Sequence, residues 1–340
     1  KLRFTVDVYQ KYVKDLLQPK VKMPTTIGYG NGYQISYMNS GKMTNKGWEF
    51  RVDAVPFQNK DWRVGVYFNI AHNENKITEM PDNYIEENYT FGNGNYAYRR
   101  EEGRPMGSFY GYRYKGVYQN KDATYARDIE GNVMKDISGN AIVMRNGSYT
   151  VAPGDAIYED VNHDGVINQY DIVYLGNSNP RLTGGAGLNV SYKQFKLSAI
   201  FYGRYGQDVV NATRLNNESM RGIDNQSTAV LRRWRNEGDQ TDIPRALYGE
   251  GYNTLGSDRF VEDASYLRLK SLSFTYRLPK KAIQRWGFNN IDVYVTGYNL
   301  FTWTKYTGQD PEVKTENTYA RDTATTPASI QLVAGFNLSF

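Results

Sequence analysis

Apolar and polar residues alternate over long stretches of this 340-residue chain. In LRFTVDVY, Leu2, Phe4 and Val6 fall on one face of an extended strand, and Arg3 and Asp7 fall on the other. Period-2 segments of roughly 9 to 12 residues recur, while long helical periodicity is hard to find. The predicted strands are 2–13, 44–56, 61–72, 182–192, 194–205, 266–278, 290–301 and the final stretch SIQLVAGFNLSF. The pattern predicts an all-β protein.

The length and chemistry of these segments favour a membrane-spanning antiparallel β-barrel. A tilted strand needs about 9–11 residues to cross a bilayer, whereas strands of soluble proteins are usually nearer 5 or 6. Charged residues such as Arg51 and Asp53 stand in mid-strand on the polar faces, which suits a water-filled lumen. Aromatic residues near strand ends suit barrel girdles, although they favour strands in soluble proteins too.

Connection lengths predict the orientation of the strands. The short connections are 57–61, 193–194 and 278–290. The long polar ones are about 14–43, 73–181, 206–262 and 302–328. Outer-membrane barrels have short periplasmic turns and long extracellular loops. Suppose that the last strand runs towards the periplasm. Every short turn then falls on the periplasmic side, provided that residues 73–181 cross the membrane an even number of times, most simply zero. The strand-like GSFYGYRYKGVY (107–118) is therefore expected in a large extracellular excursion.

The segment 266–278 changes phase part-way along. Leu267 and Leu269 occupy odd positions, whereas the apolar residues from Leu272 onward occupy even ones. Either a β-bulge near Lys270 resets the alternation, or Arg268 and Lys270 face outward at the rim and meet lipid phosphates. The bulge is the simpler interpretation.

Composition narrows the possible functions. Cysteine is absent, and the two histidines, His72 and His163, have no partner nearby in the sequence. The net charge of +5 is mild and scattered, so we expect no nucleic-acid partner. No uninterrupted apolar segment approaches the length of about 20 residues that a transmembrane helix needs. No Ser/His/Asp set or pair of carboxylates can be recognised, so we expect no enzyme.

Several motifs, in order along the chain, resemble those of one family. They are MTNKGWEFRVDA with FNIAHNENKITEM, EEGRPMGSFYGYRYKGVYQN, GDAIYEDVNHDGVINQYDIVYLGNSNPRLTGGAGLNVSYKQFKLSAIFYGRYGQDV, WRNEGDQTDIPRA, DASYLRLKSLSFTYRLP and YNLFTWTKYTGQDPEV. This series, which covers essentially the whole chain, is similar to the SusC/RagA-type TonB-dependent transporters of the Bacteroidota outer membrane.

The resemblance implies that residues 1–340 are the C-terminal part of one barrel domain, about eight strands of 22 that surround a plug. The plug, the TonB-contacting segment and the earlier strands would lie outside this chain. The resemblance also implies an outer-membrane location in a Gram-negative bacterium, with extracellular loops and a periplasmic C-terminus. The final Phe340 and its alternating strand resemble the signal that the barrel-assembly machinery reads, and this strand would close the sheet against the first strand.

The function implied by the resemblance is import of an oligosaccharide or an oligopeptide. A SusD-like surface lipoprotein would cap the mouth, TonB would supply the energy, and two transporter–lipoprotein pairs would assemble together. The 30 tyrosines suit stacking against sugars and contact with peptides alike, so they do not choose a substrate. The alternatives are a long-looped passive porin, a surface adhesin barrel, or a soluble calcium-binding β-sandwich.

The strongest local motif is DVNHDGVINQYD (160–171), which matches a 12-residue calcium loop with Gly165 at its sharp turn. The candidate ligands are Asp160, Asn162, Asp164, Val166 through its carbonyl, Asn168 directly or through water, and Asp171. Aspartate replaces the longer bidentate glutamate at the last position, and no EF-hand helices flank the loop. An ion-free turn is therefore the alternative. We predict a structural calcium ion that stiffens an extracellular loop.

Overall fold

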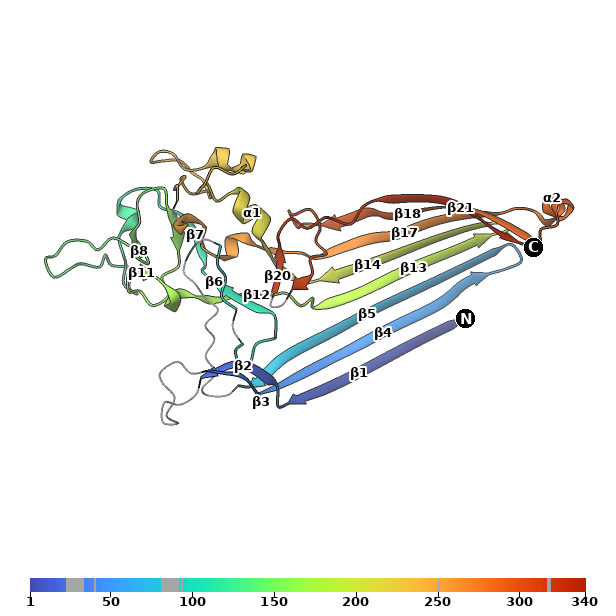
Figure 1. Cartoon of the computed structure of the whole chain (residues 1–340), viewed down its shortest axis with the longest axis horizontal. Coiled ribbons are helices and arrows are strands. Elements are labelled where there is room, and N and C mark those ends of the chain that lie inside the picture. The colour runs from blue at the N-terminus through green and yellow to red at the C-terminus, as the bar shows by residue number, and fades with distance from the viewer. Residues whose placement is uncertain are drawn as a thin grey trace.

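The computed structural model describes residues 1–22, 34–39, 41–80, 92, 94–98, 100–249, 251–316 and 319–340. One eight-stranded antiparallel sheet dominates it, and strands adjacent in this sheet follow one another along the chain (Figure 1). Its strands are β1 (Leu2–Lys14), β4 (Lys42–Gln58), β5 (Trp62–Glu79), β13 (Leu182–Tyr192), β14 (Phe195–Tyr205), β17 (Tyr266–Arg277), β18 (Asn290–Thr304) and β21 (Gln331–Ser339). These are the eight segments that the alternation predicts.

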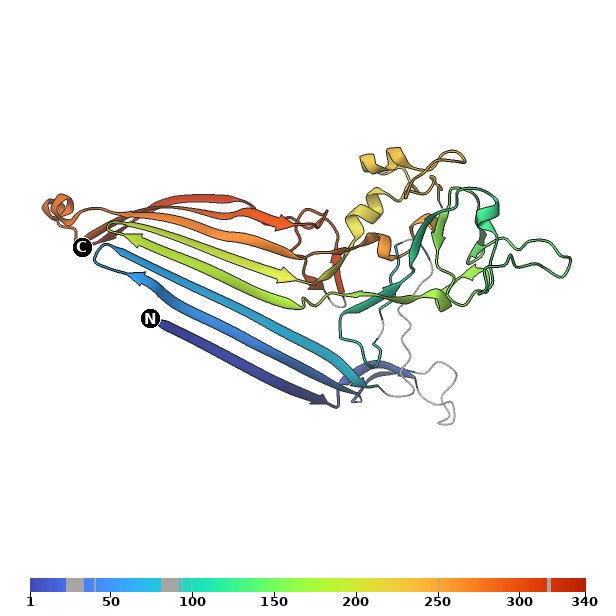
Figure 2. The same cartoon turned by 180° about the vertical axis from the view of Figure 1, so that it is seen from behind.

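The two ends of the sheet carry different connections. At one end, short turns join β4 to β5 and β13 to β14, and the helices α2 (Lys280–Ile283) and η7 (Gln284–Trp286) join β17 to β18. Both chain termini lie at this end (Figure 1, Figure 2). The opposite end carries the hairpin of β2 (Leu17–Lys22) and β3 (Gln34–Asn39), together with the smaller sheets. The connection lengths predict this asymmetry.

The segment between β5 and β13 contributes no strand to the large sheet over the residues that are described. Within GSFYGYRYKGVY, β6 (Ser108–Gly111) pairs with β12 (Val173–Asn177), and β7 (Tyr114–Val117) pairs with β10 (Ala156–Tyr158). The prediction that 107–118 is not a spanning strand is confirmed.

We refer to the described residues between β5 and β13, between β14 and β17, and between β18 and β21 as the loop assembly. Its other strands are β8 (Arg145–Asn146), β9 (Tyr149–Thr150), β11 (Val166–Ile167), β15 (Asp208–Asn211), β16 (Val261–Asp263), β19 (Thr315–Glu316) and β20 (Tyr319–Asp322). Its helices are α1 (Ala212–Asn217), η2 (Asp122–Thr124), η3 (Gln169–Asp171), η4 (Thr228–Arg232), η5 (Tyr252–Thr254) and η6 (Asp258–Phe260). In the described part of the chain, no helix has the length and apolar character needed to cross a membrane.

Most of the buried apolar side chains belong to the loop assembly and not to the large sheet. The largest cluster contains Tyr110, Tyr112, Tyr158, Ile167 and Leu255, all nearly or fully buried. Connecting loops usually lie exposed on the surface of a protein. These long connections instead pack together around a hydrophobic core of their own.

The register of the large sheet gathers its apolar side chains on one face, which we call the apolar face. One row across seven strands consists of Phe4, Val52, Phe68, Ala186, Phe201, Leu269 and Phe301. Trp48, Phe195 and Phe336 on this face are 38%, 42% and 66% exposed, and Phe50 and Phe201 are half-buried. These side chains are therefore not packed in a dry protein interior. The opposite side of the sheet is the polar face.

Candidate functional site: a polar wall, a clamped loop and an acidic turn

Charged side chains line the polar face of the sheet. Arg51 donates two hydrogen bonds, of 2.7 and 2.9 Å, to the carboxylate of Asp53 on the same strand. Arg277 of β17 makes the same two-pronged contact with Asp292 of β18, also at 2.7 and 2.9 Å. Both pairs are open to solvent. This wall can offer charges of both signs to a polar molecule beside it.

A buried arginine fastens part of the loop assembly to this wall. Arg268 of β17 is 3% exposed and donates to Asp310, to Glu312 Oε2 at 2.9 Å and to Thr302 Oγ1 at 2.8 Å. Lys270 Nζ lies 2.8 Å from the same oxygen of Glu312. We refer to Arg268, Lys270, Asp310 and Glu312 as the Arg268 clamp.

The clamp decides between the two interpretations of the phase change in β17. Pairing with β14 passes from Leu269 to Ser271 while β14 advances by one residue, so Lys270 is the extra residue of a β-bulge. The predicted bulge is confirmed. The alternative, in which Arg268 and Lys270 face outward to lipid phosphates, is wrong, because both side chains meet carboxylates of the chain itself.

Opposing effects act on the Asp310 carboxyl of the clamp. Burial disfavours the charged carboxylate, but the N–H groups of Ala328 and Glu312 and the guanidinium of Arg268 outweigh burial, and the pKa of Asp310 is lowered. Asp310 therefore stays ionised at neutral pH, as a partner of a buried arginine must. The segment that follows β18 is thus held to the polar face by ion pairs with Arg268.

The loop 160–171 is organised by its own backbone. Asp160 accepts hydrogen bonds from the N–H groups of Asp164 and Gly165, at 3.3 and 2.8 Å. Asp164 accepts from the N–H of Val166 at 2.8 Å, and its other oxygen accepts from the Asn162 amide at 2.9 Å. Gly165 has φ +81°, the left-handed turn that the motif requires at this position. The structure therefore brings Asp160, Asn162 and Asp164 together.

Asp171 closes the other side of this loop and is fully buried. Its two carboxylate oxygens accept hydrogen bonds from the N–H groups of Val161 and Asn168, both at 2.8 Å. Burial raises the pKa of Asp171, those N–H bonds oppose the rise, and the charges of Asp160 and Asp164 add to it. Asp171 therefore fixes the backbone at both ends of the loop.

The remaining two candidate ligands contact each other. The Asn168 amide donates to the Val166 carbonyl at 3.1 Å, and Asn168 also caps the turn η3 through the N–H of Tyr170. His163, at a non-ligand position, is exposed with φ +56°. Among the residues that the structure describes, no group of three or more His, Cys, Asp or Glu side chains is placed to hold a metal ion.

Comparison with known proteins places this geometry in a family. No family model matches the chain. TonB-dependent receptor P3 of Formosa agariphila is 32% identical over 324 residues, which are 93% of this chain and 29% of that protein. TonB-dependent receptor SusC of Bacteroides thetaiotaomicron is 28% identical over 98% of this chain and 30% of its own length. The solved structure of the RagAB peptide transporter matches with a TM-score of 0.73 and 28% identity, over 100% of this chain and 33% of that one.

This chain belongs to the SusC/RagA-type TonB-dependent receptors. It spans about a third of the length of the relatives that it matches. The large sheet is a segment of the wall of an outer-membrane β-barrel. In such barrels the apolar face meets lipid and the polar face meets the lumen, so the Arg51–Asp53 and Arg277–Asp292 pairs line the bore of this SusC/RagA-type receptor.

Two features of the site could not be predicted from the sequence. The contact of Arg268 with Asp310 and Glu312 joins residues more than 40 positions apart, and only the phase change in β17 hinted at it. The glycines of β13 and β14 are visible in TGGAG and YGRY, but only the strand register shows which of them lie opposite each other.

Proposed function

We propose that the full-length protein imports an oligomeric nutrient through this barrel, driven by TonB. The observation that carries the proposal is a sheet with a lipid-facing apolar side and a charged bore, matched over the whole chain by SusC and RagAB relatives. A bore lined with solvated ion pairs suits a polar cargo in transit, because such pairs exchange partners at little cost. A plug, a TonB-contacting segment and further strands, outside these residues, complete the transporter.

A SusD-like surface lipoprotein is the proposed partner at the mouth. The loop assembly faces the cell exterior and the C-terminus faces the periplasm, since the long connections gather at one end of the sheet and both termini at the other. The packed core of the loop assembly gives a lid a firm surface to close against. Two transporter–lipoprotein pairs assemble together in this proposal.

The proposed cargo is an oligopeptide or an oligosaccharide. The solved RagAB relatives are described as a peptide transporter and a peptide importer, and these descriptions favour the peptide. The test is uptake of fluorescent oligopeptides and oligosaccharides of matched size by cells with and without the gene for the full-length protein. We expect uptake of one class to be lost in the deletion strain and restored by the gene.

Addition of a protonophore separates the proposal from its alternatives. Import coupled to TonB stops when the proton-motive force collapses. Uptake that continues unchanged would instead identify a passive porin with long loops. A deletion strain with normal uptake of both classes but weakened surface attachment would identify an adhesin.

We also propose that the loop 160–171 binds calcium as a structural ion. Asp160, Asn162 and Asp164 already gather at one turn, and oxygen donors of this type suit a hard cation. The ion would contact their side chains, the Val166 carbonyl, Asn168 and Asp171. Calcium there would offset the mutual repulsion of the three carboxylates. The role is to stiffen the loop assembly.

The test of calcium binding compares D160A/D164A with D136A in the full-length protein. Asp136 accepts hydrogen bonds from the N–H groups of Ser138 and Asn140 in a similar exposed turn, which lacks the glycine at the sixth position and the acidic residue at the twelfth. We expect D160A/D164A to bind one calcium fewer per chain by metal analysis, and to lose the stabilisation by calcium that D136A keeps. Equal calcium content and equal melting with and without chelator in both variants would refute the site.

A further inference from the structure

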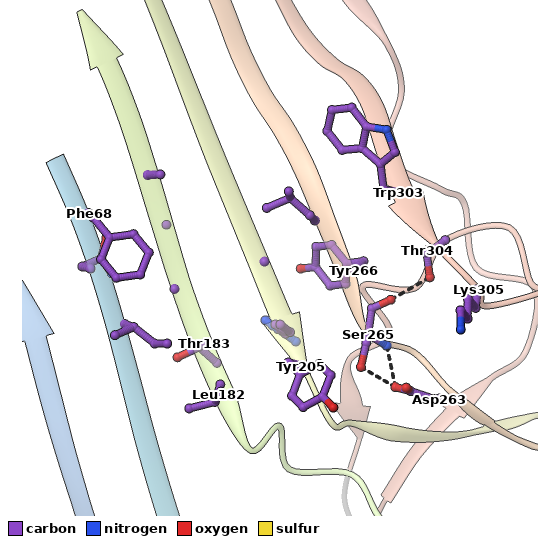
Figure 3. A pocket seen from close by; sticks show the side chains of 18 residues that line it. Phe68, Leu182, Thr183, Tyr205, Asp263, Ser265, Tyr266, Trp303, Thr304 and Lys305 are labelled. Carbon is purple, nitrogen blue, oxygen red and sulfur yellow. Dashed lines mark hydrogen bonds between the residues drawn. The ribbon is translucent and has the colours of Figure 1, made fainter. Parts of the chain in front are cut away.

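Tyrosine and arginine side chains alternate on the polar face of β14 and β17, at the end of the sheet that carries the loop assembly. Tyr202 of β14 lies directly opposite Arg268 of β17, and Arg204 lies directly opposite Tyr266. These residues alternate along their strands with members of the apolar face, so they point to the polar face. The centroids of the two tyrosine rings are 6.2 Å apart. Figure 3 shows Tyr266 near Thr304, at the end of β17 that adjoins the loop assembly. We refer to Tyr202, Arg204 and Tyr266 as the Arg204 site.

Arg204 has no carboxylate partner among the described residues. Its Nε donates to the Tyr202 hydroxyl at 3.2 Å, and the centre of its guanidinium lies 5.9 Å from the centroid of the same ring. By contrast, Arg51, Arg268 and Arg277 on this face each pair with a carboxylate. Arg204 is half-buried, so its side chain can still meet a ligand from the lumen. The guanidinium is therefore a cation that an anionic ligand can pair with.

The Tyr266 hydroxyl is a second unsatisfied group at this site. Tyr266 is 5% exposed, and its buried hydroxyl oxygen has no hydrogen-bond partner in the part of the chain that the structure describes. The guanidinium of Arg268 lies 5.3 Å from the centroid of the Tyr266 ring, but its donors serve the Arg268 clamp and Thr302. Buried polar groups almost always have a partner, and one without a partner is destabilising. An unpaired guanidinium and an unpartnered hydroxyl on paired residues together indicate a binding site for an acceptor group.

The charges around the Arg204 site leave one positive charge in excess. The Arg268 clamp contributes two cations and two carboxylates, which balance. The exposed Asp263 and Lys305, at the same end of the sheet (Figure 3), add one charge of each sign. Arg181 and Asp208, which attract each other just beyond the strands, add another balanced pair. The excess charge of Arg204 therefore suits a singly charged carboxylate better than a phosphate group, which carries about 1.5–2 negative charges.

We propose that the Arg204 site binds a carboxylate group of the cargo, an inference that rests on the proposed function. The two terminal nitrogens of Arg204 donate to the two carboxylate oxygens, an arrangement that the planar guanidinium favours. The Arg204 side chain turns towards the ligand when it gives up its hydrogen bond to Tyr202, and this movement uncovers the Tyr266 hydroxyl as a further donor. The Tyr202 ring packs against the adjoining part of the cargo. A peptide supplies the carboxylate at its C-terminus or in acidic side chains, and an oligosaccharide supplies it in uronic acids.

The position of the site favours the cargo over a segment of the transporter as the source of the carboxylate. The site lies at the end of the sheet that we assign to the cell exterior, so an incoming molecule meets it before most of the polar face. In the pairing with β13, Thr183 lies opposite Arg204 and Gly185 lies opposite Tyr202. Small residues in a strand leave room for a ligand to approach the sheet closely.

The test measures which members of a mixture the full-length transporter binds after purification in detergent with its co-purifying proteins. The first probe is a library of peptides of about ten residues without acidic side chains, each present with a free C-terminal carboxylate and as the amide. The second probe is a set of oligogalacturonates and their methyl esters. Equilibrium dialysis with mass spectrometry gives the bound fraction of each compound. In the class that the transporter binds, we expect the carboxylate form to bind about tenfold more tightly than the neutral form.

Two variants of Arg204 and one matched control make the test specific. R204Q removes the charge and should abolish the preference while binding of the neutral forms stays unchanged. R204K should keep part of the preference, because lysine keeps the charge without the planar fork. Arg63 of β5 is exposed on the same face, opposite Ser191 at the other end of the sheet, and has no ion pair among the described residues. R63Q should therefore keep the full preference. The heat-dependent shift in gel migration shows that each variant is folded.

Other outcomes would overturn the proposal. Wild-type protein that binds carboxylate and neutral forms equally, or binds neither, or a preference that R204Q leaves unchanged, would show that Arg204 takes no carboxylate from the cargo. Photoreactive benzoylphenylalanine in place of Tyr202 that crosslinks to the plug or the lid without any probe would show that the transporter itself covers the site. Uptake in cells separates this inference from the proposed function. TonB-dependent uptake whose rate and preference R204Q leaves unchanged would overturn this inference alone, whereas absence of uptake in the wild type would overturn both.

Discussion

Removal of the Arg268 guanidinium should free the segment after β18 while the barrel stays folded. In R268A the Asp310 carboxylate, 17% exposed, loses its cation, whereas Glu312 keeps Lys270 at 2.8 Å. Breaking a fully buried ion pair costs about 3–5 kcal/mol. Because Glu312 keeps one partner and both carboxylates retain some contact with solvent, we expect the smaller cost of about 2–3 kcal/mol for this clamp.

Limited proteolysis of the full-length protein in detergent measures this cost. Lys314 and Arg321 are trypsin sites in the segment that the clamp holds. When cleavage follows local opening, its rate reports the opening free energy. A loss of about 2–3 kcal/mol predicts cleavage about 30- to 150-fold faster, since 1.4 kcal/mol is a factor of ten.

R51A is the matched control, because Arg51 also pairs with a carboxylate on the polar face but is 57% exposed. Exposed pairs of this kind contribute little to stability, so R51A should be cleaved at the wild-type rate. Equal cleavage rates in R268A, R51A and the wild type would refute the reasoning. Loss of the whole barrel in R268A would also contradict it, because the clamp would then hold more than a loop.

Three further predictions address the clamp, the apolar face and the loop assembly. The pKa of Asp310 is lowered, so the stability that its charge supplies is present above the unfolded pKa of about 4 and is lost as the pH falls through the folded value. The protection factors of the amides of residues 305–316, which are their hydrogen-exchange rates corrected for the intrinsic rate at each pH, should therefore be constant from pH 7 to about 5 and fall below about 4. A fall in these protection factors near pH 6 would contradict this. The variant L197R, with arginine on the apolar face, should lower the free energy of folding into vesicles by up to about 2–4 kcal/mol, whereas S198R on the polar face should fold as the wild type does. Equal effects of the two variants would contradict the assignment of the faces. G111A should lower the melting temperature of the loop assembly, because the new Cβ would lie 2.3 Å from the Gly256 carbonyl oxygen, while G65A meets nothing closer than 3.9 Å and should be silent; unchanged melting of G111A by calorimetry would show that the loop adjusts freely.

The spanning strands could be predicted because the side chains of a barrel strand face lipid and water in turn, so apolar and polar residues alternate along its sequence. The break between Leu269 and Leu272 even located the bulge at Lys270. The partner of Arg268 could not be predicted, since Asp310 and Glu312 reach it only through the folded path of β18 and the loop that follows. No local pattern encodes such a contact.

The arrangement of the loop 160–171 could be predicted in part. Spacing placed Asp160, Asn162 and Asp164 at one turn, and the structure brings them together. Spacing did not reveal that Asp171 would be fully buried with both oxygens bound by N–H groups, because burial depends on packing against the rest of the loop assembly. Likewise, Arg204 and Tyr266 lie opposite each other only through the register of β14 with β17.

Site-directed spin labelling tests whether one face of the sheet meets lipid and the other meets water. Single cysteines at 195–198 of β14 and 334–337 of β21 would carry the label in the full-length protein in vesicles, after removal of any other cysteine. We expect collision with lipid-soluble oxygen and with a water-soluble nickel complex to alternate with period two, with oxygen dominant at 195, 197, 334 and 336. Equal accessibility to both reagents along the two strands, or exclusion of both at 195 and 336, would contradict it.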